Sequence, residues 1–149
     1  MQQLLDPQIS LEEPSHTYVH ANHPGLEFTS CTGLIGTFFE PFDGLAIAEK
    51  LISTHSKYQG QSPQQLIEQW QEAGRRGSRV HGEIDQYLKN RIPPTEELAL
   101  IAVQWLDEQN WNGAELLSEA ILYSTELKLA GTVDLISLDP TTKTLNLYD

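Results

Sequence analysis

Apolar residues recur every three or four positions through most of the chain, a spacing typical of helices that bury one face. Capping or helix-breaking residues bound each of these runs. Ser62, followed by Pro63 at the first helical position, is a strong start signal, and Thr95 is expected to cap the last run. The pattern predicts successive helices in residues 30–39, 43–54, 62–74, 74–91 and 95–110.

From Glu115 onwards the apolar period changes to two, which is typical of strands with one buried face. Short polar turns separate three such runs, so we expect an antiparallel meander. The strands are predicted in residues 116–125, 129–138 and 143–149. Helices followed by a sheet that they must cover define an α+β fold, and no linker divides residues 1–149 into more than one domain.

The segment before the helices is expected to carry little structure of its own. Residues 1–15 are interpreted as a loose lead-in, and residues 16–30 as a hairpin with its turn at residues 22–25. The hairpin holds three histidines, which are expected to be exposed rather than to bind metal: His16, His20 and His23.

The composition is that of an ordinary folded chain, with 39% hydrophobic and 20% charged residues. No apolar run approaches the length of about 20 residues that spans a bilayer, and the start lacks the basic-then-apolar order of a signal peptide. The single cysteine, Cys31, excludes an internal disulfide and a cysteine-built metal site. A reducing cytoplasm is therefore expected.

A net charge of −12 by itself argues against nucleic-acid binding, because phosphate binding depends on lysine and arginine. Metal-dependent nucleases nevertheless keep acidic centres, and basic residues cluster locally in this chain. The cluster, which is either a solvated helix end or a phosphate contact, consists of Arg75, Arg76 and Arg79.

Each predicted strand of the meander carries one acidic residue within its apolar alternation: Glu119, Asp134 and Asp149. Neighbouring strands lie about 4.8 Å apart, so acids that share one face of the sheet would be close together. Carboxylates at that distance repel unless a cation neutralises them, and oxygen ligands favour Mg²⁺ or Mn²⁺. The register decides between such a metal site and isolated surface acids, and alternation alone does not fix it.

Three segments, "GRRGSRVHGEIDQYL", "SEAILYSTELKLAGTVDLI" and "LNLYD", occur in the order found in one nuclease family. The chain resembles the RecB-type branch of the PD-(D/E)xK nuclease superfamily, and most of all its phage-type and mitochondrial-maintenance-type exonucleases. Gly77 and His81 match a G-x-x-x-H helix pattern. Asp134 matches the first catalytic aspartate, Asp149 the acid of the D/E-x-K motif, and Glu119 the acid on the preceding strand.

The resemblance implies metal-dependent hydrolysis of DNA phosphodiester bonds by an exonuclease, in a phage or in DNA repair or recombination. His81, Asp134 and Asp149 would bind Mg²⁺ or Mn²⁺, beside Glu119, and Asp85 would orient the His81 ring. The enzyme would work in the cytoplasm, or in that of a host if phage-encoded. The side chains expected to hold DNA phosphates, on a turn before the His81 helix, are Arg75, Arg76 and Arg79.

The end of the sequence departs from the family pattern. The family's lysine would stand two residues after Asp149, where this sequence stops, so we expect a chain truncated inside its motif and inactive as it stands. An extended chain with that lysine is expected to degrade DNA. Two alternatives stay open: a non-catalytic nucleic-acid-binding or regulatory module of the same fold, and an unrelated scaffold with surface acids.

Four further side chains near the predicted site also have predicted roles. Glu83 is expected to be solvated. The aromatic residues could stack on unpaired bases, although core packing is favoured for the first two of them: Tyr87, Trp105 and Trp111.

Overall fold

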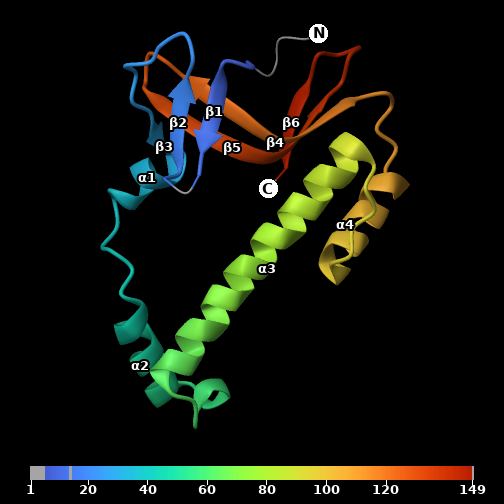
Figure 1. The fold of residues 1–149 in the computed structure, drawn as a ribbon. Coiled ribbons are helices and arrows are strands. Elements are labelled where there is room, and N and C mark those ends of the chain that lie inside the picture. The colour runs from blue at the N-terminus through green and yellow to red at the C-terminus, as the bar shows by residue number, and fades with distance from the viewer. Residues whose placement is uncertain (1–5, 14, 149) are drawn as a thin grey trace.

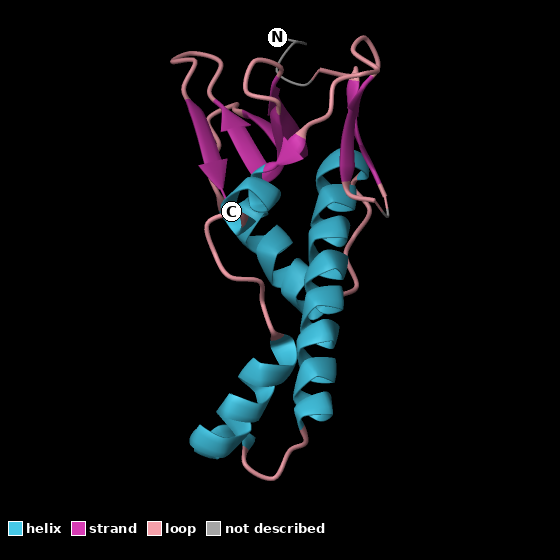
Figure 2. Cartoon of the chain, turned by 90° about the vertical axis from the view of Figure 1, so that its left-hand side faces the viewer, coloured by secondary structure: helices cyan, strands magenta, loops and turns pink. Residues whose placement is uncertain are grey.

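The computed structural model describes residues 6–13 and 15–148 and has the predicted α+β fold. Its strands gather at one end of the molecule (Figures 1 and 2). From that end the long helix α3 (Pro63–Asn90) runs to α2 (Gly44–Thr54), which packs at the far end of α3. None of the helices in the described part of the chain is long and apolar enough to cross a membrane.

The C-terminal strands form the predicted meander, with β5 (Leu129–Leu138) between β4 (Glu115–Ser124) and β6 (Leu145–Tyr148). Both pairings are antiparallel, as the short polar turns require. The second half of β5 is buried from Leu135 to Leu138, and Ile136 is fully buried there. The change of apolar period at Glu115 therefore marks the start of the sheet correctly.

The N-terminal hairpin differs from the prediction in its partner strand. β2 (Thr17–His20) pairs with β1 (Ile9–Glu12), so the expected loose lead-in over residues 1–15 is wrong for β1. The physical reason is burial, because Ile9 and Tyr18 form a small core with Ala130 of β5. Residues 1–5 and 14 lie outside the described residues.

The segment expected to return from the hairpin pairs elsewhere. Instead of residues 26–29 facing β2, the short strand β3 (Thr29–Ser30) runs parallel to the start of β5. His20, expected to be exposed, is only 4% exposed, and its Nε2 lies 3.1 Å from the hydroxyl oxygen of Tyr123. The hairpin is thus fastened to the sheet by both apolar and polar contacts.

The first two helices begin where their caps predict. Ser30 accepts a hydrogen bond from the Gly33 amide and starts α1 (Cys31–Gly36). Asp43 accepts from the Ala46 amide and starts α2. A short 3₁₀ turn over Ser56–Tyr58 follows α2.

The two helices predicted over residues 62–74 and 74–91 are one helix, α3, of 28 residues. Its start is as predicted, with Ser62 and Gln65 forming a capping box and Pro63 at the first position. Gly74 lies inside the helix and does not end it. An interior glycine weakens a helix without stopping it when the apolar stripe continues on both sides, as it does here.

The last helix, α4 (Glu97–Glu108), is capped by a residue from another helix. Thr95 was predicted to cap it, but the cap position is Glu96, whose own side chain makes no capping bond. The Glu83 carboxylate of α3 accepts from the Thr95 and Glu96 amides, at 2.6 and 2.7 Å. The expectation that Glu83 is solvated is therefore wrong, since this side chain joins α3 to α4.

Candidate metal centre

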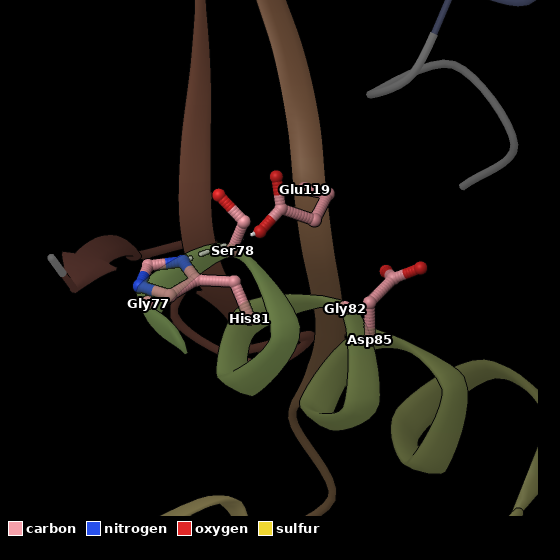
Figure 3. Close-up of a pocket in the computed structure, with 6 residues that line it drawn as sticks. All are labelled: Gly77, Ser78, His81, Gly82, Asp85 and Glu119. Atoms are coloured by element: carbon pink, nitrogen blue, oxygen red, sulfur yellow. Dashed lines mark ion pairs between the residues drawn. The ribbon is translucent and has the colours of Figure 1, made fainter. Parts of the chain in front are cut away.

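Three potential metal ligands from three different elements converge beside the sheet. The Nδ1 atom of His81, on α3, lies 3.3 Å from Asp134 Oδ1 on β5 and 3.5 Å from Glu119 Oε1 on β4. One ligand atom from each residue lies within 4.8 Å of the other two. Figure 3 shows the His81 ring and the Glu119 carboxylate turned toward each other across the space between α3 and β4.

Sheet register brings the two acids together. Ser118 pairs with Leu135 and Ala120 pairs with Val133, so Glu119 and Asp134 face each other between these pairs. Residues opposite each other in an antiparallel ladder project to the same face. The predicted convergence of Glu119, Asp134 and His81 is thus present in the structure, whereas Asp149 lies outside the described residues.

A polar contact fixes α3 against β4 next to these ligands. The Ser118 hydroxyl donates to Asp85 Oδ1 at 2.7 Å, and Lys89 Nζ lies 2.7 Å from the same oxygen. Within the described residues, Asp85 makes no hydrogen bond to the His81 ring. The expectation that Asp85 orients His81 is therefore wrong, because Ser118 and Lys89 engage its carboxylate.

The backbone at Glu119 has an unusual conformation for a strand. Its φ is 48°, in the left-handed region that non-glycine residues seldom adopt. Such a conformation costs on the order of 1–3 kcal/mol and persists only where the surroundings impose it, often at functional sites. The sequence gives no signal of it, since no glycine or asparagine stands at this position.

Burial and neighbouring charge act on the Glu119 carboxyl. Partial burial, followed by the negative charge of Asp134, raises its pKa above the ordinary value, while the nearby His81 opposes that rise. Asp85 adds a smaller effect in the raising direction. A cation between Glu119 and Asp134 would reverse this penalty, because it favours the charged form of both groups.

The ligand set is one imidazole nitrogen and two carboxylates. Carboxylates suit Mg²⁺ and Mn²⁺, and imidazole is a frequent ligand of transition metals such as Mn²⁺. A hollow of about 170 Å³ lies among these side chains and is lined by His81, Ile84, Asp85, Ser118, Glu119 and Asp134. The residues present therefore fit a divalent cation in both chemistry and spacing.

The arginines expected to contact DNA have protein partners in this structure. All three lie inside α3, so the predicted turn before the His81 helix is wrong. Glu72 accepts hydrogen bonds from Arg75 at 2.9 Å and from Arg79 at 3.0 Å, and Arg76 lies 2.5 Å from Glu96. Their guanidinium groups would have to exchange these carboxylates for phosphates in order to bind DNA.

Two of the three aromatic residues considered for base stacking are anchored to the protein. The Tyr87 hydroxyl donates to Asp107 at 2.6 Å, and the Trp111 indole donates to the Leu106 carbonyl at 2.8 Å. Trp105 is 48% exposed and meets Trp111 edge to face. The predicted core packing of Trp105 is therefore only partial.

No family model matches the chain, and comparisons with curated proteins and with solved structures find no significant match.

Proposed function

We propose that the chain carries the metal centre of a DNA nuclease of the PD-(D/E)xK type, with His81, Glu119 and Asp134 as ligands. The observation that carries this proposal is their convergence within 4.8 Å from three separate elements. The two facing carboxylates repel each other, and the pKa of Glu119 is raised. This arrangement is unfavourable without a cation, and a bound metal ion would account for it.

The chain's residues have separate tasks in this proposal. Asp134 and His81 hold the cation, and Glu119 binds it directly or through a water molecule, together with Asp149. Bound Mg²⁺ or Mn²⁺ lowers the pKa of water and stabilises charge on a phosphoryl group. Ser118 and Asp85 keep α3 and β4 at the spacing that the ligands need, through their 2.7 Å hydrogen bond.

The substrate in this proposal is DNA, attacked from an end in the manner of an exonuclease, and the compartment is the cytoplasm. Because the chain has a net charge of −12 and repels phosphates, a cation would have to be bound before a phosphate could approach the site. Arg75 and Arg79 would then assist by leaving Glu72 for the DNA backbone.

Calorimetric titration with Mn²⁺ and with Mg²⁺ tests the centre directly. We expect one cation to bind. Loss of a residue that only hydrogen-bonds to a metal ligand typically weakens metal binding by about 10–100-fold, so His81→Ala, which removes a ligand itself, should weaken it by at least that factor. His55→Ala, which removes a histidine at the end of α2, is the matched control and should bind as the native chain does. No binding by the native chain, or equal binding by both variants, would contradict the centre.

A second candidate is a non-catalytic nucleic-acid-binding or regulatory module of the same fold. The observation that favours it is that Arg75, Arg76 and Arg79 already contact a carboxylate of Glu72 or Glu96, which weakens the attraction of that surface of α3 for phosphates. Digestion of single- and double-stranded DNA in Mn²⁺ by a chain lengthened with x-Lys after Asp149 separates the two candidates. Metal binding and DNA binding without cleavage would favour the module.

A further inference from the structure

A second, larger hollow lies beside the metal ligands and has a floor of small residues. It measures about 460 Å³ and is lined by Gly77, Ser78, His81, Gly82, Asp85 and Glu119. Figure 3 shows both glycines on the turns of α3 that carry His81. Because His81 and Glu119 border both hollows, a molecule lying in the larger one reaches the metal ligands.

The fold itself gives no reason for glycine at positions 77 and 82. A Cβ atom added at either position would meet no atom within 4 Å, and neither residue has a left-handed backbone. Gly131 is a contrasting case, because a Cβ there would come within 2.9 Å of Cys31 Sγ. Glycine inside a helix is less stable than alanine, so Gly77 and Gly82 weaken α3 without improving its packing.

We propose that Gly77 and Gly82 are steric determinants of substrate binding, and that the sugar–phosphate backbone of a DNA strand lies against α3 at this point. This inference rests on the proposed nuclease function. The missing side chains let the strand touch the helix backbone, and so bring a phosphate to the cation held by His81, Glu119 and Asp134. The volume suits a nucleotide rather than a lone ion, since small-molecule sites typically occupy about 300–1,000 Å³.

Charge around the hollow makes this binding depend on metal. Asp85 and Glu119 border it, and the Asp85 charge is balanced by Lys89 at 2.7 Å. Among the described residues, the Glu119 carboxylate forms an ion pair with no side chain other than His81. A phosphate is therefore repelled in the metal-free chain and attracted once the cation is bound.

Alanine and methionine substitutions at three glycines of α3 test the inference. Gly77 and Gly82 line the hollow, whereas Gly74 has the same open surroundings but does not line it, and serves as the matched control. All the alanine variants should raise the midpoint of thermal unfolding slightly, because alanine favours the helix. The affinity for a labelled single-stranded oligonucleotide in Mn²⁺ should fall only at positions 77 and 82. We expect a loss of about 5- to 150-fold for methionine, as a steric clash of ordinary size produces.

Each result has a distinct meaning. If the native chain binds Mn²⁺ and the oligonucleotide, and the variants at 77 and 82 bind as the Gly74 variants do, the inference is overturned while the nuclease proposal stands. If the variants at 77 and 82 lower the unfolding midpoint relative to Gly74→Ala, protein fills the hollow and the inference is also overturned. If the native chain binds no Mn²⁺, both proposals fail together.

Discussion

Replacing Asp134 by asparagine should stabilise the metal-free protein. The Asp134 and Glu119 carboxylates face each other with ligand atoms no more than 4.8 Å apart, and both side chains are about one third exposed, at 34% and 35%. Asparagine has nearly the same shape, so Asp134→Asn removes the charge and leaves the packing in place.

Coulomb's law sets the size of the effect. Two unit charges 4.8 Å apart repel by about 0.9 kcal/mol in water and by about 3.5 kcal/mol at an effective dielectric constant of about 20. Since both carboxylates are partly exposed, we expect a gain of about 1–2 kcal/mol in the free energy of unfolding. For a chain of this length, that gain raises the unfolding midpoint by about 2–8 °C.

Bound metal should reverse the order of stability, so that the native chain becomes more stable than the Asp134→Asn variant. Mn²⁺ at about 100 times its dissociation constant stabilises the native chain by about 2.7 kcal/mol through mass action, and the Asp134→Asn variant by much less. Calorimetric unfolding in low salt at pH 8, with chelator and then with Mn²⁺, measures both orders. Asp139→Asn is the control, because Asp139 follows β5 and accepts hydrogen bonds from the Thr141 and Thr142 amides instead of facing another acid.

The control variant should lose stability in chelator and respond to Mn²⁺ as the native chain does. An unchanged or lower midpoint for metal-free Asp134→Asn would refute the electrostatic reasoning. Equal stabilisation of the native chain and the Asp134→Asn variant by Mn²⁺ would show that Asp134 does not hold the cation.

Two further predictions concern the dependence of stability on pH. The pKa of Glu119 is raised in the folded protein, so the metal-free chain should lose stability as the pH rises from the ordinary glutamate pKa of about 4.3 through the raised pKa. In thermal unfolding between about pH 4 and pH 8, Glu119→Gln should lose less stability than the native chain. The pKa of Glu83 is lowered, chiefly by the Glu96 amide and then by Thr95, so its contribution is present above about pH 4.3 and is lost as pH falls through the lowered value. Glu83→Gln should therefore unfold at lower temperature than the native chain at pH 7, and an equal midpoint there would contradict the role of Glu83 as the cap of α4.

Strand alternation predicted the meander, whereas the meeting of the two acids also required the register, which alternation alone does not fix. In β4 and β5 the period of two determines on which face of the sheet each side chain lies. The short turns favour an order in which consecutive strands are neighbours. Once the strands pair in register, Glu119 and Asp134 must share a face. His81 was expected at the site only from the family resemblance of its G-x-x-x-H pattern, because no local rule says against which strand a helix packs.

Long-range pairing explains most of the errors. β1 was missed because residues 9–12 form a short segment with only two apolar residues, Ile9 and Leu11, and the burial of Ile9 with Ala130 is what makes the segment a strand. The break expected at Gly74 was wrong because glycine is a weak helix breaker when the helix is supported on both sides. Hydrogen bonds such as those that Glu83 accepts from the Thr95 and Glu96 amides join residues 12 and 13 positions apart, which no pattern of neighbouring residues reveals.

The region around His81 breaks several local rules of stability within one small volume. Like charges stand opposite each other on neighbouring strands, Glu119 has a left-handed backbone, and Gly77 and Gly82 lie inside a helix with room for larger side chains. Elsewhere along α3, Arg75, Arg76 and Arg79 are paired with carboxylates, and Glu83 accepts hydrogen bonds from the start of α4. Features that each weaken the fold are expected to occur together only where another requirement outweighs stability. A bound cation relieves the first, and a substrate strand lying against α3 gives a reason for the glycines. The same argument makes stability an informative readout here, because Asp134→Asn and alanine at positions 77 and 82 should weaken binding and yet make the free protein more stable.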